Sequence, residues 1–128
     1  MCNSIKSVSY LLNITPALST ILKEAEKYYA HIPPKSLEQQ IPAEILQDHV
    51  ELVQSKFEKL VEAHHLDKVI DSLISTLIKK FSFENDAVLA NFIKKLFINT
   101  VVYHDYGKIN ENFQASPQKM NNTFFLGK

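Results

Sequence analysis

This chain of 128 residues has very little of several residue types that stabilise other classes of protein. It holds a single cysteine, Cys2, which excludes an internal disulfide and favours a reducing compartment. Only 2 glycines and 5 prolines are present, and no segment alternates apolar and polar residues as half-buried strands do. We therefore expect helices joined by short loops.

An excess of charge of one sign is also missing, because 14 basic residues balance 14 acidic ones. The chain lacks the overall cationic field that drives non-specific binding to nucleic acid, so any such contact must be local. The apolar stretch from Val8 to Leu12 is followed by Asn13 and is too short for a secretory signal or a membrane span. We expect a cytoplasmic bacterial or archaeal protein with no membrane contact.

Apolar residues at helical spacing predict an all-α helical bundle that forms a single domain over residues 1–128. Four helices are expected, at about residues 15–32, 42–65, 67–81 and 84–106, with one short helical turn beyond Lys108. Thr15 and Pro16 should begin the first of them, and Pro42 the second. The fourth helix should pack into the core through one face, formed by Val88, Leu89, Phe92, Ile93, Leu96, Phe97 and Val101.

The most informative segment follows directly, as Tyr103-His104-Asp105-Tyr106-Gly107-Lys108. An imidazole and a carboxylate at the end of a buried helix can converge on one cation, although neighbouring helix residues diverge by roughly 100°. Gly107 is expected to end the helix in the left-handed conformation and to deliver Lys108 beside the pair. Alone, the dipeptide is a weak signal, because a histidine on an apolar face is more often a hydrogen-bonded core residue than a ligand.

His49 is the expected third member of this site. It lies one helical turn from Ile45, Leu46 and Val53, so it projects at the edge of the inward face of the second helix. Imidazole together with carboxylate suits Mn, Fe, Co or Ni, and also accepts Zn or Mg, so the identity of the metal is not readable.

The string from His104 to Lys108, continued by Phe113-Gln114, resembles the HD-type nuclease domain of the CRISPR-associated helicase-nuclease of type I interference systems. The context of His49, Leu46-Gln47-Asp48-His49-Val50-Glu51-Leu52-Val53, is similar to that of the family's first metal ligand. The resemblance implies the HD phosphohydrolase fold, a divalent metal held by His49, His104 and Asp105, and a phosphate contact from Lys108, with Asp105 and Lys108 catalytic. It also implies cleavage of single-stranded DNA in antiviral defence, with helicase domains in cis or trans and a CRISPR RNA-guided surveillance complex as partners.

The chain departs from the family pattern after the Gly-Lys turn. The family draws further histidines and a final aspartate from that region, whereas residues 106–128 contain neither residue type. A Gly-x-x-x-x-Gly-Lys-Ser/Thr loop is also missing, so we expect no helicase motor within these 128 residues. We expect a truncated, N-terminal part of the nuclease domain that binds metal weakly, cuts DNA poorly and self-associates through exposed apolar surface.

Other interpretations remain open at this point. The chain could be an HD-superfamily nucleotide phosphohydrolase, or a non-enzymatic helical module that binds a partner. His64 or His65 could replace His49 as the first ligand, although histidines near a helix C-terminus usually only interact with its dipole. His31, beside Pro33-Pro34, is expected to be exposed.

Overall fold

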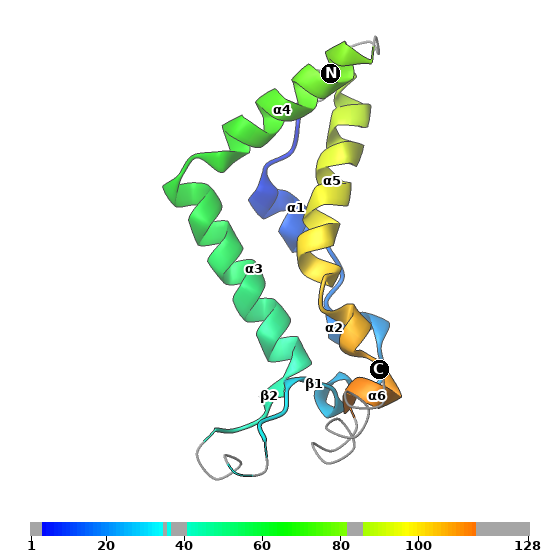
Figure 1. Ribbon diagram of the computed structural model, residues 1–128. Helices are drawn as coiled ribbons and strands as arrows, with labels where there is room; N and C mark the ends of the chain where they lie inside the picture. Colours follow the sequence, from blue (N-terminus) through cyan, green and yellow to red (C-terminus); the bar gives the residue numbers. More distant parts are fainter. Residues whose placement is uncertain (1–3, 35, 37–40, 82–85, 115–128) are drawn as a thin grey trace, which may run out of the picture. The chain divides into compact units, whose positions relative to one another are not determined.

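The computed structural model describes residues 4–34, 36, 41–81 and 86–114. Helices account for most of them and confirm the all-α class (Figure 1). The α-helices are α1 (Val8–Ile14), α2 (Leu18–Ile21), α3 (Leu46–Ala63), α4 (Leu66–Lys80), α5 (Ala87–Tyr103) and α6 (Glu111–Gln114). The remaining elements are the 3-10 turns η1 (Ala25–Lys27) and η3 (Tyr106–Lys108) and the strands β1 (Tyr29–His31) and β2 (Glu44–Ile45). Among the described residues, no helix combines the length and apolar character needed to cross a membrane.

The described residues form two compact units, each built from two stretches of the sequence. The first unit comprises the described residues within 4–16 and 53–103, and the second those within 17–52 and 104–114. Helix α3 contributes residues to both units.

In the first unit, helix α5 packs against both α4 and α1 (Figure 1). The core between α4 and α5 centres on Ile74, Ile78 and Ala90. Val8 and Leu11 of α1 are also buried. The third predicted helix is confirmed almost to the residue. The fourth is confirmed within the described residues and ends at Tyr103 rather than Tyr106.

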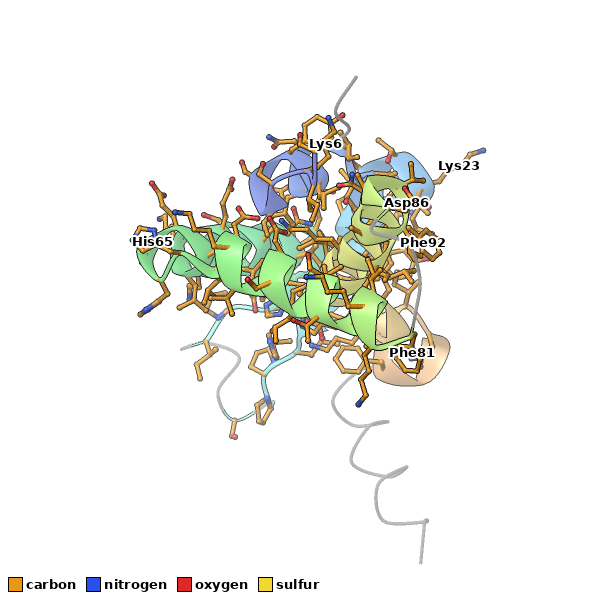
Figure 2. All side chains as sticks on the ribbon, turned by 90° about the horizontal axis from the view of Figure 1, so that it is seen from above. Lys6, Lys23, His65, Phe81, Asp86 and Phe92 are labelled. Atoms are coloured by element: carbon orange, nitrogen blue, oxygen red, sulfur yellow. The ribbon has the colours of Figure 1, made fainter. Side chains whose placement is uncertain are left out.

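The buried face of α5 is not the one that the apolar spacing predicts. The fully buried positions are Ala90, Lys94, Ile98 and Val102. Much of the predicted face is instead exposed, with Val88 at 62%, Phe92 at 58% (Figure 2), Leu96 at 51% and Phe97 at 45%. Because α5 is apolar on nearly every side, the spacing of its large residues could not determine which side the neighbouring helices cover.

Lys94 is the only charged residue that is fully buried among the described positions. Its ammonium lies 2.5 Å from Asp67 Oδ1 and 2.7 Å from Asp71 Oδ1, both on α4. Asp67 Oδ1 also accepts a hydrogen bond from the Val8 backbone N–H at 3.0 Å. A charge can be buried only when it is paired in this way, so the cluster ties α5, α4 and α1 together.

In the second unit, the first predicted helix is wrong over most of its length. Thr15 caps the C-terminus of α1 rather than beginning a helix, and α2 covers only four residues. Glu24 then takes a left-handed conformation with φ of 56°, which interrupts any continuing helix. The chain goes on to form β1, whose pairing with β2 overrides the helical spacing.

The two strands form a small antiparallel hairpin. Tyr29 pairs with Ile45 and His31 pairs with Glu44, with an irregularity between the two pairs. The Leu46 N–H donates to the Tyr28 carbonyl at 2.8 Å and extends the ladder to the start of α3. Because residues 44 and 45 are held in this ladder, the second helix begins at Leu46 and not at Pro42.

Candidate metal centre

Three of the side chains singled out from the sequence lie together in the second unit. His49 comes from the first turn of α3, and His104 and Asp105 follow the last residue of α5. Asp105 Oδ2 lies 2.9 Å from His49 Nε2 and 2.9 Å from His104 Nε2. The side chains of Asp105 and His49 are largely buried, at 12% and 18% exposure, and that of His104 is half exposed. The ligand atoms of His49, His104 and Asp105 lie within 4.8 Å of one another, so the three side chains form a group that could hold a metal ion.

A short 3-10 turn, rather than a left-handed glycine, carries the chain from α5 past the pair. No glycine among the described residues has positive φ, so the expectation for Gly107 is wrong. The Lys108 N–H donates to the Asp105 carbonyl at 2.9 Å, which closes the turn η3. Asn110 then begins α6, because its side-chain oxygen accepts the Phe113 N–H at 2.9 Å.

Lys108 pairs with the carboxylate oxygen of Asp105 that the histidines leave unused. Its ammonium lies 2.8 Å from Asp105 Oδ1, while Oδ2 faces both imidazoles. Burial by itself raises the pKa of the Asp105 carboxyl. The hydrogen bond and charge of Lys108, together with His104 and His49, outweigh this effect, and the pKa lies below its usual value. Asp105 is thereby kept in the anionic form that a cation requires.

Gln114 links the turn to the hairpin. Its side-chain carbonyl accepts the Tyr29 N–H at 2.8 Å, and its amide donates to the Tyr29 carbonyl at 2.9 Å. The same amide donates to the Lys108 carbonyl at 2.8 Å. The side chain therefore pairs with β1 as a neighbouring strand would and holds β1 beside η3.

Two further site residues, His31 and Glu44, have no counterpart in the sequence expectations. Glu44 Oε2 lies 3.5 Å from His31 Nε2 and 3.1 Å from His49 Nδ1. His31 is exposed, as expected, but its ring meets that of His49 edge to face, with centroids 5.1 Å apart. The only signal that could have found them is the strand register, which brings together residues 13 positions apart.

The rival histidines, His64 and His65, lie at the opposite end of α3. They form the turn into α4, where Figure 2 labels His65. His65 takes a left-handed conformation with φ of 51°. Both side chains are exposed and belong to the first unit. Within the described residues, the groups that could hold a metal ion use His49 and neither of these two.

His49, His104 and Asp105 form direct ion pairs, and the same three side chains could hold a divalent cation. When two ligand atoms each lie about 2.1 Å from one cation, they are roughly 3.0 Å apart at a right angle and roughly 3.4 Å apart in a tetrahedron. Both N–O distances around Asp105 Oδ2 are close to the first value. Two imidazoles and one carboxylate would leave further coordination positions of a bound cation open to water.

In comparison with known proteins, no family model, no curated protein and no solved structure matches this chain.

Proposed function

We propose that this chain is a metal-dependent phosphohydrolase of the HD type, which cleaves phosphodiester bonds of single-stranded DNA in cytoplasmic CRISPR defence. The observation that carries the proposal is the meeting of His49, His104 and Asp105. Two segments 55 residues apart place their ligand atoms within 4.8 Å of one another. The His-Asp and Gly-Lys motifs select the HD class, and Phe113-Gln114 favours the nuclease over nucleotide hydrolases.

Each residue has a distinct task in this proposal. When bound, a divalent cation supplies a Lewis acid for a phosphoryl oxygen and a water of lowered pKa. His49 and His104 would hold it through Nε2, and Asp105 through Oδ2. Lys108 fixes the orientation of the carboxylate through Oδ1. The positive charge of Lys108 would also stabilise the negative charge that develops on the phosphate in the transition state.

A nuclease assay on circular single-stranded DNA tests the proposal. We expect slow cleavage with Mn²⁺, Co²⁺ or Ni²⁺, and none with chelator. Asp105→Asn and His49→Ala should abolish cleavage because each removes a ligand. His64→Ala is the matched control, since it removes an exposed imidazole from the other end of α3, and should leave the rate unchanged.

Two outcomes would count against the nuclease. If no added metal supports cleavage, or if Asp105→Asn cuts as fast as the unaltered chain, the cluster is not catalytic. Release of phosphate from mononucleotides, with DNA left intact and the same sensitivity to Asp105→Asn, would instead assign the site to nucleotide hydrolysis.

A further inference from the structure

A second group of metal-binding side chains lies on the hairpin, on the other side of the His49 ring. His31 and Glu44 are cross-strand neighbours in β1 and β2. The ligand atoms of His31, Glu44 and His49 lie within 4.8 Å of one another. The cluster differs from the first in two of its three residues and in the nitrogen of His49 that it uses, Nδ1 rather than Nε2.

The Nδ1 atom of His49 gives an independent reason to place a ligand here. It is buried and has no hydrogen-bond partner among the described residues, although Glu44 Oε2 is only 3.1 Å away. The contact is close enough for an ion pair but is not aligned as a hydrogen bond. When Nδ1 is unprotonated, its lone pair and the Glu44 carboxylate face each other, and a cation between them would satisfy both groups.

The distances agree with this interpretation. The two N–O separations, 3.1 Å from His49 and 3.5 Å from His31, are near the roughly 3.0 and 3.4 Å that right-angled and tetrahedral coordination produce. We propose that His31, Glu44 and His49 form a second binding site for a borderline divalent cation of the Zn²⁺, Co²⁺ or Ni²⁺ type. The proposal does not depend on nuclease activity.

Because both sites use the same imidazole, they compete. A neutral imidazole has one nitrogen lone pair for a metal, and binding a second cation requires loss of the remaining ring proton. The second cation should therefore bind more weakly than the first, whichever site fills first. The hairpin ligands lie upstream of His49, whereas the family pattern draws its further ligands from downstream of the Gly-Lys turn.

Titration with Co²⁺, followed by visible absorption, tests the hairpin site separately from the first one. His104→Ala/Asp105→Asn removes two ligands of the first site, and this variant should still bind one Co²⁺. Adding His31→Ala or Glu44→Gln to that background should weaken the remaining binding by more than roughly tenfold, since even loss of a residue behind a ligand costs that much. His64→Ala in the same background is the control and should change nothing.

Two results would overturn the proposal. They are absence of Co²⁺ binding by a folded His104→Ala/Asp105→Asn variant, and retention of full affinity when His31→Ala is added to that variant. Should the double variant not fold, histidine side-chain ¹⁵N chemical shifts of the unaltered chain with Zn²⁺ give the answer. They should report coordination at His31 Nε2, and an unchanged His31 at saturating Zn²⁺ would refute the site.

Discussion

Replacing both Asp67 and Asp71 by asparagine should leave the ammonium of Lys94 buried without a counter-ion. The Lys94 side chain is fully buried, and both carboxylates lie within 2.7 Å of its Nζ. Asparagine keeps the size of each side chain and retains a carbonyl oxygen that can accept the Val8 N–H. The substitution therefore removes charge while it conserves packing.

The expected loss in the free energy of unfolding is about 3–5 kcal/mol, the cost of removing the partner of a buried ion. The carboxylates are about one third exposed, so water can reach them, and the lower half of this range is the better expectation. For a domain of this size, such a loss lowers the melting temperature by roughly 10–20 °C. Adding Lys94→Met removes the stranded charge and should return stability to within about 1 kcal/mol of the unaltered chain.

Urea denaturation, followed by far-ultraviolet circular dichroism, measures all three proteins under one condition. A loss below about 1 kcal/mol in the double variant would refute the burial of a charged Lys94 against α4. Failure of Lys94→Met to restore stability would show that lost packing, and not stranded charge, caused the effect.

Three further predictions concern the site and the exposed surface. The carboxyl of Asp105 should titrate with a pKa below the usual value of about 3.9, so its contribution to stability is complete above pH 3.9 and is lost as the pH falls through the lower folded pKa. Lys108→Met should raise the pH at which this stability is lost, and carboxyl ¹³C chemical shifts measure the change. Gln114→Ala removes three hydrogen bonds, so it should lower the free energy of unfolding by about 1–3 kcal/mol and weaken Co²⁺ binding. Gln47→Ala is the control, because it removes one exposed hydrogen bond to Glu51 and should change neither quantity. The exposed apolar face of α5 should drive self-association, so light scattering should detect a species larger than a monomer. Phe92→Glu should lower the amount of this species, whereas the control Lys95→Glu, on the same helix, should not.

The long elements were predictable because their apolar residues repeat at the helical period over four turns. Helices α4 and α5 follow the predicted ranges for this reason. The buried face of α5 was not predictable from the sequence, because it depends on which side of the helix α4 and α1 cover. Lys94 illustrates the point: nothing local marks a lysine as a core residue until Asp67 and Asp71 are seen beside it.

The candidate site divides in the same way. His49, His104 and Asp105 were accessible from the sequence because each lies within a recognisable motif. His31 and Glu44 were not, because strands of three and two residues carry no readable period, and their register depends on distant contacts. Gln114 belongs to the Phe-Gln motif, yet its role in pairing with Tyr29 follows only from a contact across 85 residues.

Metal analysis after equilibrium dialysis against Zn²⁺ tests the central claim most directly, because His49 contributes to both clusters. The unaltered chain and His64→Ala should retain equal amounts of Zn²⁺ above the level of the dialysis buffer, and folded His49→Ala should retain none. Retention of Zn²⁺ by His49→Ala at the level of the unaltered chain would contradict the account, as would an unaltered chain that retains no Zn²⁺.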